Sequence, residues 1–387
     1  MAIRVNPKLI HVLEKYGAED VQNCYHCGSC SAVCAHTDDT FVFPRKPMRL
    51  LQMGLEKRIE ASLDPWLCYY CGQCSTQCPR GAEPGETMMS LRRWLTSRYD
   101  FTGISRLFYS SWKAELALLI LVALLTAASF LAFGLTHGNI HAYDGPNAFL
   151  PSAAVHLFDW GMAVVLASLL LVNAVRMWWL TTGSNPRVRP RLSSYLRALY
   201  LLPLHFLTQK QYARCESKRP WLIHLGLMLS YVTMLVLIMF FLARMQEGPA
   251  IRWSVHAFGY VASVGLLGAV FYALRGRLKK AQPHLKHSHE SDWIFLAMLL
   301  LVTVTGVVQH VLHRTGAELA ANVAYVVHLM FVVPMLVLEV PFGKWSHLAY
   351  RPLAAYLAAI HRDALASQRS AVTTGEQAPA TAALRAA

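Results

Sequence analysis

Composition and charge argue against a wholly soluble protein. The chain has 387 residues, of which 55% are hydrophobic and 15% charged, and its formal net charge is +14. The positive charge does not indicate nucleic-acid binding, because the Lys and Arg residues lie beside the ends of long apolar runs and no recognition motif accompanies them. We therefore predict no nucleic-acid partner.

Eight of the nine cysteines form two runs near the N-terminus. The runs are Cys24-x2-Cys27-x2-Cys30-x3-Cys34 and Cys68-x2-Cys71-x2-Cys74-x3-Cys78, and Pro79 follows the second. This spacing is typical of proteins that hold two [4Fe–4S] clusters. Three cysteines on one loop can reach three iron corners of a cubane cluster, and the fourth thiolate comes from the other run.

The crossed arrangement predicts one ligand set for each cluster. Gly28 and Gly72 follow the second cysteine of each run, where we expect the backbone to turn tightly. Ala35 stands where the second run has Pro79, a departure that touches no ligand. The predicted ligands are Cys24, Cys27, Cys30 and Cys78 for the first cluster, and Cys34, Cys68, Cys71 and Cys74 for the second.

Two other uses of these cysteines are weaker. A disulfide framework needs an oxidising compartment, and we expect none because no secretory signal peptide is recognisable before Cys24. Structural zinc sites usually pair C-x2-C units across a dozen or more residues. The ninth cysteine, Cys215, lies in a basic segment, and we interpret it as a free thiol without a role.

We predict a mainly α protein with an α-helical dicluster ferredoxin domain and a six-helix cytochrome b-type membrane bundle. Residues 1–100 form the first domain, with helices over Met48–Glu60 and Thr87–Tyr99. Residues 101–112 are an aromatic linker suited to a membrane interface, and residues 113–350 form the membrane domain. Residues 351–387 are a tail, and we expect disorder from Ala364 because little there can be buried.

Six apolar runs are long enough to cross a bilayer, which needs about 20 helical residues. Buried soluble helices could explain one such run but hardly six in succession. The runs lie near residues 113–135, 154–178, 220–242, 254–274, 291–313 and 320–342.

Charge predicts the orientation of these spans. By the positive-inside rule the basic connections face the cytoplasm, so both termini and the clusters face it too, in a multi-pass protein of the inner membrane. Residues 190–215 mix Arg with Leu, Tyr and Pro, and we expect a helix on the inner membrane surface there. The basic connections carry Arg187, Arg189, Arg191, Arg197, Lys210, Arg214, Lys218 and Arg219, and Arg275, Arg277, Lys279, Lys280 and Lys286. The opposite ones hold Arg244, Arg252 and Arg314.

Histidines within the apolar runs are candidate haem ligands, because a polar ring is costly in lipid. His328 and His347 are 19 residues apart. If both lie on the sixth helix, they are roughly 28 Å apart and cannot share a haem. We expect His224 and His347 both to lie near the inner face, so we pair them for an inner b-type haem.

An outer haem would use His328, with His310 as the first candidate for its second ligand. His256 and His156, at the outer ends of the fourth and second spans, are the alternatives. Hydrogen bonding between helices is the simpler role for any of these rings. Three further histidines, in a basic connection, could bind a metal, but a solvated loop is the simpler interpretation; these are His284, His287 and His289.

The residues also resemble a known family. Trp66–Met89, which reads WLCYYCGQCSTQCPRGAEPGETMM, is similar to the C subunit of the quinone-interacting membrane-bound oxidoreductase complex. The 24–78 region resembles the C subunit of heterodisulfide reductase, and Phe43–Gly54 (FPRKPMRLLQMG) fits both. The membrane half resembles the gamma subunit of respiratory nitrate reductase around His224, His328 and His347. Met234 stands near the place of that subunit's second histidine on the helix of His224.

The resemblance implies an electron-transfer subunit of a multi-subunit quinone oxidoreductase. Such a subunit carries two [4Fe–4S] clusters and one or two b-type haems, and takes quinone or quinol as substrate. Its partners are flavin and iron–sulfur A and B subunits, the membrane quinone pool and adenylylsulfate reductase of dissimilatory sulfur metabolism. Arg252 and His256 are candidates for quinone binding, although an interfacial Arg and a helix-end His explain them as well.

Two alternatives stay open from the sequence. One is a heterodisulfide-reductase-type subunit with another soluble partner. The other is a membrane scaffold or sensor whose cysteines hold zinc.

Overall fold

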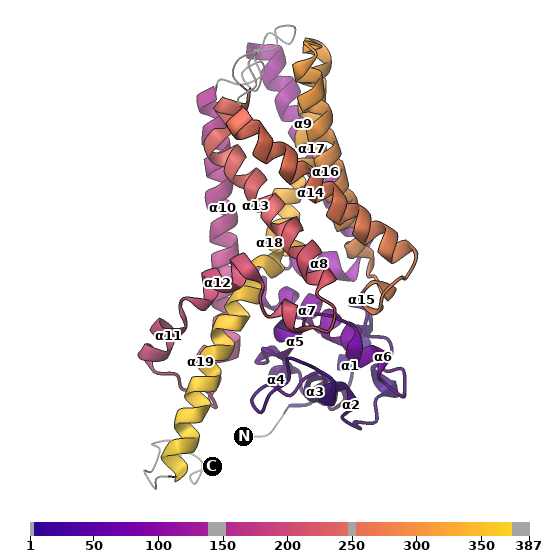
Figure 1. Cartoon of the computed structure of the whole chain (residues 1–387), viewed down its shortest axis with the longest axis vertical. Helices are drawn as coiled ribbons and strands as arrows, with labels where there is room; N and C mark the ends of the chain where they lie inside the picture. Colours follow the sequence, from indigo (N-terminus) through magenta and orange to yellow (C-terminus); the bar gives the residue numbers. More distant parts are fainter. Residues whose placement is uncertain (1–3, 138–151, 247–252, 374–387) are drawn as a thin grey trace. The chain divides into compact units, whose positions relative to one another are not determined.

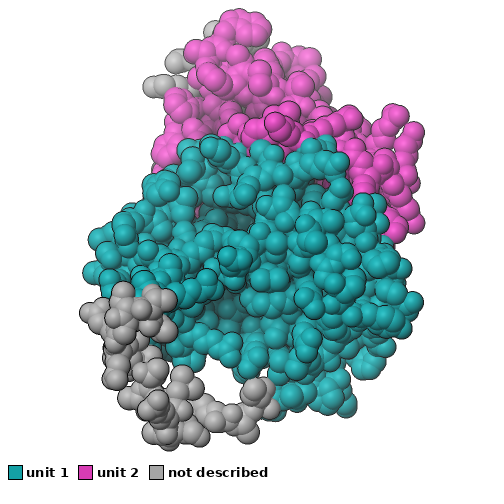
Figure 2. All heavy atoms as spheres, turned by 60° about the horizontal axis from the view of Figure 1, so that its bottom comes forward, with its two compact units in different colours: residues 1–106, 172–217, 347–387 teal, residues 107–171, 218–346 magenta. Residues whose placement is uncertain are grey.

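The computed structural model describes residues 4–137, 152–246 and 253–373, and these contain helices and connections but no strand. They divide into two compact units, coloured separately in Figure 2. Unit 1 contains residues 1–106, 172–217 and 347–387, and unit 2 contains residues 107–171 and 218–346. The predicted domains were continuous stretches of chain, whereas each unit combines separate segments.

The N-terminal part of unit 1 is built from seven short helices around one apolar core. Leu13, Met48 and Leu91 are fully buried in it, and they join the first, third and last of these helices. The helices are α1 (Leu9–Glu14), α2 (Ser29–Ala32), α3 (Arg45–Gln52), α4 (Glu56–Glu60), α5 (Asp64–Leu67), α6 (Gln73–Thr76) and α7 (Pro84–Tyr99) (Figure 1).

The structure corrects one predicted helix and confirms another. The helix predicted over Met48–Glu60 is wrong, because Gly54 has a φ of +65° and separates α3 from α4. A Cβ at this glycine would lie 2.3 Å from the carbonyl oxygen of Asn6, so the close approach requires glycine. The helix predicted over Thr87–Tyr99 is present as the larger part of α7.

Unit 1 also contains segments from later in the chain. The long helix α19 (His347–Thr373) packs within this unit against α5, α11 (Leu192–Ala198) and α12 (Leu201–Thr208). The rings of Tyr350 and Trp66 lie 5.1 Å apart by centroids, and the Trp66 indole donates a 3.2 Å hydrogen bond to the Tyr99 hydroxyl. This aromatic cluster ties α19 to α5 and α7.

Two expectations change here. The segment 190–215 folds as α11, α12 and the short helix η3 (Tyr212–Arg214) rather than as one helix, and it still exposes Leu192, Leu196 and Tyr200. The expected disorder does not begin at Ala364, because α19 continues to Thr373, and residues 374–387 lie outside the described part of the chain.

Unit 2 holds most of the apolar helices. All six predicted spans are present as helices long and apolar enough to cross a membrane, which indicates a membrane protein. The spans are Trp112–Ala132, Leu157–Gly183, Arg219–Phe241, Trp253–Leu278, Glu290–Arg314 and Leu319–Phe342. They belong to α9 (Trp112–His137), α10 (Ser152–Trp178) with η2 (Trp179–Gly183), α13 (Arg219–Gln246), α14 (Trp253–Leu278), α16 (Glu290–Arg314), and α17 (Glu318–Pro334) with η4 (Met335–Glu339) and α18 (Val340–Phe342).

Small residues let these helices pack closely. A Cβ at Gly265 of α14 would lie 2.2 Å from the Ser230 hydroxyl of α13, so a larger residue would require that hydroxyl to rotate away. The helices α16 and α17 pack on each other, and α9 packs on α17. Short elements complete the unit: α8 (Ile104–Ser110), which crosses the unit boundary, α15 (Pro283–Lys286) and η5 (Lys344–Ser346).

The end of the sixth span differs from the expectation. The helical path ends at Phe342, Gly343 is extended, and a new helix begins at His347. His347 therefore lies on α19 in unit 1, while His328 lies on α17 in unit 2. The placement of both histidines on one helix is wrong, so the 28 Å spacing does not follow from helix geometry.

Candidate functional site

The two cysteine runs have the same local backbone. Gly28 and Gly72 have φ values of +91° and +83°, which confirms the predicted tight turns. Each is followed at once by a one-turn helix, α2 or α6, and these two helices contact each other. Two residues earlier, His26 and Tyr70 also have positive φ values of 59° and 53°. The second run thus repeats the loop of the first.

The thiols of the two runs interact in the crossed pattern that the spacing predicts. Burial raises the pKa of Cys30, and the nearby thiols of Cys24, Cys27 and Cys78 raise it further. We call Cys24, Cys27, Cys30 and Cys78 the first thiol set.

The remaining four cysteines interact in the same way. Burial raises the pKa of Cys34 to about 11, and the charges of Cys68 and Cys71 add to the effect. Burial also raises the pKa of Cys74. The charges of Cys68, Cys71 and Cys34 raise it further, and Cys30 of the first set has a smaller effect. We call Cys34, Cys68, Cys71 and Cys74 the second thiol set.

The two sets differ in exposure. Cys27 of the first set is exposed, and Cys24 and Cys78 are partly exposed. In the second set Cys68 and Cys74 are buried, with 7% and 8% of their surface accessible. The first set therefore lies nearer the surface of unit 1.

Backbone amides and a hydroxyl reach several of these sulfurs. The amides of Tyr70 and Ala82 donate to the sulfurs of Cys68 at 3.3 Å and Cys78 at 3.4 Å. The Ser29 hydroxyl lies 3.4 Å from the Cys27 sulfur, and this contact lowers the pKa of that thiol. Donors of this kind favour the thiolate form that iron binds.

Two arginines converge on the backbone of the second set. Arg92 of α7 and Arg351 of α19 both donate to the carbonyl oxygen of Cys68, the latter at 2.6 Å. Arg92 also donates to the Pro65 carbonyl at 2.6 Å. Burial lowers the pKa of Arg92 to about 9, so it is still charged at neutral pH. The second set therefore lies in a positive environment.

The structure gives Cys215 surroundings that the sequence did not reveal. Its thiol hydrogen-bonds to Cys71 of the second set, and its sulfur lies 3.4 Å from Nε2 of His36. This contact lowers the pKa of Cys71 to about 6 and raises that of Cys215. Cys215 is buried. No local pattern predicts this position, because Cys215 is distant in sequence from both runs.

Aromatic and histidine side chains surround the same place. Tyr69 stacks near Tyr212 with centroids 5.4 Å apart, and its hydroxyl lies 3.3 Å from Nε2 of His205. The guanidinium of Arg351 lies 4.2 Å from the Tyr69 ring centroid. The second thiol set is thus covered by residues from α12, η3 and α19.

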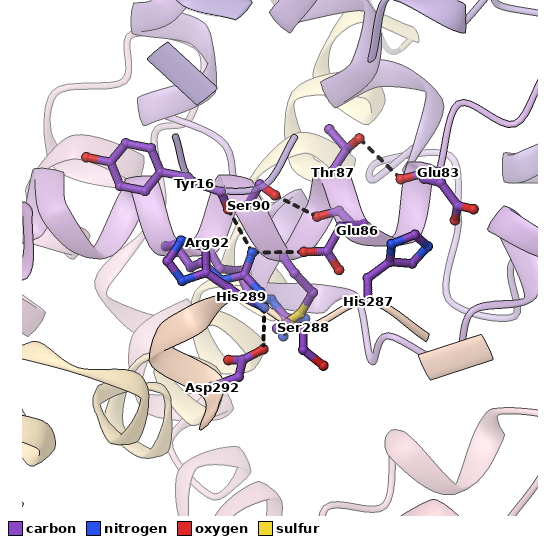
Figure 3. A network of polar contacts seen from close by, with 12 residues as sticks. Tyr16, Glu83, Glu86, Thr87, Ser90, Arg92, His287, Ser288, His289 and Asp292 are labelled. Carbon is purple, nitrogen blue, oxygen red and sulfur yellow. Dashed lines mark hydrogen bonds and ion pairs between the residues drawn. The ribbon is translucent and has the colours of Figure 1, made fainter. Parts of the chain in front are cut away.

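An ion pair on α7 holds the other side of the cysteine loops. Arg93 pairs with Glu86 at 2.8 Å and donates to the Tyr16 carbonyl at 2.7 Å. The Tyr70 hydroxyl donates to Glu86 at 2.6 Å, which ties the second run to α7. Figure 3 shows this network, in which the Ser90 hydroxyl also donates to the Glu86 carbonyl oxygen at 3.0 Å.

The candidate ligands of the outer haem have polar neighbours on adjacent helices. Nδ1 of His328 lies 2.9 Å from the Thr305 hydroxyl, and the ring packs on Gly306, where a Cβ would lie 3.0 Å from it. Nε2 of His310 lies 3.0 Å from the Tyr260 hydroxyl, and its ring is 5.7 Å from that of His256 by centroids.

Other predicted residues are placed as follows. Nε2 of His256 lies 2.7 Å from a guanidinium nitrogen of Arg314. His224 lies on α13 in unit 2. His347 is the first residue of α19 in unit 1. The side chain of His156 and all of Arg252 lie outside the described residues.

His289 of the 284–289 connection has a structural role at the start of α16. His289 caps α16 by accepting from the Ser291 amide, while Asp292 accepts from the His289 amide, as the dashed line in Figure 3 marks. Throughout the described ranges no three His, Cys, Asp or Glu side chains gather around a single-ion position.

Comparison with known proteins identifies the N-terminal region. Residues 20–82 match the family of 4Fe-4S dicluster domains. No curated protein and no solved structure matches the chain. The match covers both cysteine runs, so the chain carries an iron–sulfur domain of the kind used in electron transfer, joined to six membrane-length helices.

Proposed function

We propose that the chain is the membrane subunit of a quinone-interacting oxidoreductase. It passes electrons between quinone in the membrane and soluble flavin and iron–sulfur subunits, and it acts on no soluble substrate alone. The dicluster match over residues 20–82 carries this proposal. The six apolar helices in the same chain supply its membrane side.

Each thiol set holds one [4Fe–4S] cluster. Thiolates are the ligands that these clusters require, and the clusters supply one-electron chemistry when bound. The mutual charge effects among Cys30, Cys24 and Cys78, and among Cys74, Cys68 and Cys34, support the crossed assignment. The zinc alternative is weaker, because a zinc site needs four sulfurs about 2.3 Å from one ion, and the described thiols do not gather around a single-ion position.

A b-type haem is assigned to His224 and His347, and a second to His328. The surroundings of His328 fit an axial ligand, since Thr305 engages Nδ1 and leaves Nε2 for iron. The first candidate for its second ligand, His310, has Nε2 engaged with Tyr260, and that of His256 is engaged with Arg314. A haem at His328 therefore requires one of these contacts to open, or His156 as the ligand.

The soluble partners distinguish a subunit of the quinone-interacting family from a heterodisulfide-reductase-type subunit. A complex containing flavin and iron–sulfur A and B subunits, with adenylylsulfate reductase as the electron acceptor or donor, fits the quinone-interacting family. A heterodisulfide-reductase-type subunit would copurify with a different flavoprotein. In both, the positive-inside rule applied to the basic connections favours the cytoplasmic side of the inner membrane for the thiol sets and the termini.

Spectra of the anaerobically purified chain test the proposal. We expect broad absorbance near 400 nm from the clusters and sharp bands from reduced b-type haem. His347→Ala should remove the inner haem while the iron–sulfur signals stay, because α19 and the cysteine runs supply different ligands. Full haem content in this variant would refute the pairing, and a colourless protein would refute the redox function itself. Affinity purification of the tagged chain then identifies the copurifying flavoprotein.

A further inference from the structure

Unit 2 contains two buried carboxyl groups that the proposed cofactors do not use. Glu115 lies in the first turn of α9, and Glu339 is the last residue of the π-helical turn η4. Both residues are 0% exposed. Both lie within membrane-length apolar helices, where an ionisable group is costly and usually has a function.

These carboxyl groups lie against each other in unit 2. The side chains of Glu115 and Glu339 approach within hydrogen-bonding reach, and the backbone amide of Lys344 approaches Glu339. Neither contact has the geometry of a good hydrogen bond, so all four carboxyl oxygens are left unsatisfied by the described residues. Two negative charges cannot be held side by side without solvent, so the pair must carry at least one proton.

The backbone is shaped around Glu339. A Cβ on Gly343 would lie 2.1 Å from Oε2 of Glu339, so only glycine lets the carboxyl group fold back over the end of the span. The preceding turn is π-helical, a distortion that is frequent at functional sites.

A chain of charged groups leads away from the pair within unit 2. Glu339 interacts with the positive charge of Lys344, and Glu115 interacts with the negative charge of Asp292. Nζ of Lys344 lies 2.5 Å from Oδ1 of Asp292, and Arg277 lies 3.7 Å from Oδ2.

The chain of groups reaches more exposed residues. The Arg277 guanidinium donates to the Ser288 hydroxyl at 2.5 Å, in the basic connection that precedes α16. The Lys344 side chain is 24% exposed. The neighbouring Glu290 side chain is 63% exposed. Polar groups thus run from the buried pair toward the end of the unit that carries α15.

We propose that Glu115 and Glu339 form a proton-exchange site, with Asp292 and Lys344 as the route by which its proton equilibrates with water. The shared proton passes from one carboxyl oxygen to a carboxylate or water on this route and returns to the same pair, so no other reactant is consumed. The proposal rests on the proposed function for its purpose, since quinone takes up or releases protons together with electrons. Such a site would exchange protons with water at the α15 end of unit 2.

Infrared spectroscopy of the full chain in lipid nanodiscs tests this directly. At neutral pH we expect a C=O band of a protonated carboxyl group that shifts when the sample is moved into D2O. The band should disappear in Glu339→Gln and in Glu115→Gln. In Asp292→Asn and Lys344→Met it should stay, with an exchange rate slowed by about tenfold or more.

Glu290→Gln is the matched control, because it removes an exposed carboxyl group at the start of the same helix as Asp292; it should leave both the band and its exchange rate unchanged. The proposal is overturned if the band survives both glutamate substitutions, if it is absent from the wild-type chain, or if it does not exchange with D2O. Visible spectra of the same samples report the redox cofactors separately, so loss of the proposed function would not be mistaken for loss of this site.

Discussion

The two thiol sets share one loop geometry and differ in what surrounds it. The first set is open to solvent at Cys27, whereas the second is enclosed by Arg92, Arg351 and Cys215. Burial, nearby charge and hydrogen bonds to sulfur set the reduction potential of a cluster. We therefore expect two clusters of unequal potential, because positive groups around the second set favour its more negative, reduced state. The exposed first set is the better placed to exchange electrons with a soluble protein.

The largest expected effect is the difference in stability between variants that lose one ligand of either thiol set. Cys74→Ala removes a buried ligand that packs against the loop of the first run, so we expect loss of the second cluster and a loss of stability of several kcal/mol. Cys27→Ala removes an exposed ligand and should cost the first cluster with less unfolding. Iron content and thermal unfolding of both variants measure the difference. Equal destabilisation would break the comparison.

The second effect concerns acid stability. Burial lowers the pKa of His36 and of His205 to about 4, below the usual 6.5, and Arg351 lowers both further. Between pH 4 and pH 6.5 the unfolded chain therefore binds more protons at these two histidines than the folded chain does. The stability that the neutral histidines contribute is complete above pH 6.5 and is lost as the pH falls toward 4. Each histidine should contribute a slope of at most about 1.4 kcal/mol per pH unit.

Because both rings lie beside the second thiol set, acid should release iron from that set first. Iron release and the cluster signals, followed from pH 7 to pH 4, measure this. His205→Gln keeps a hydrogen-bonding group near Tyr69 and should flatten the pH dependence. If the exposed first set lost its iron at the higher pH, the proposed difference in enclosure would be wrong.

The smallest effect is on the potential of the second cluster. Cys215→Ala removes a thiol that hydrogen-bonds to Cys71, worth about 1 kcal/mol. For one electron this is a fall of roughly 20 to 60 mV. Cys215→Ser retains a donor and should recover part of the change. A redox titration followed by electron paramagnetic resonance measures both clusters, and the unchanged first cluster is the internal control. An unaltered potential of the second cluster would show that Cys215 does not tune it.

The features predicted from sequence are those encoded over short distances. The spacing of the cysteines, the turns at Gly28 and Gly72 and the six apolar runs each depend on neighbouring residues, and the structure contains all three. The sequence does not predict the break at Gly54, because a glycine within a helical pattern does not reveal that the Asn6 carbonyl approaches it. The sequence does not predict the break at Gly343 for a similar reason, and because of this break His347 does not belong to the sixth span.

Other features depend on folding across long sequence distances. Cys215 meets Cys71 only because the segment that contains η3 folds onto the cysteine loops within unit 1. Glu115 and Glu339 are single acidic residues at opposite ends of the membrane half, and only the packing of unit 2 brings them together. For Glu339 a signal existed in the sequence, since a carboxyl group within an apolar run is itself unusual.

The most direct test of the central claim is a count of iron, acid-labile sulfide and haem in the anaerobically purified full chain. We expect four iron and four sulfide per cluster for two clusters, with additional iron in b-type haem. Electron paramagnetic resonance should show two distinct reduced clusters. A preparation that contains zinc and neither sulfide nor haem would contradict the claim that this chain conducts electrons.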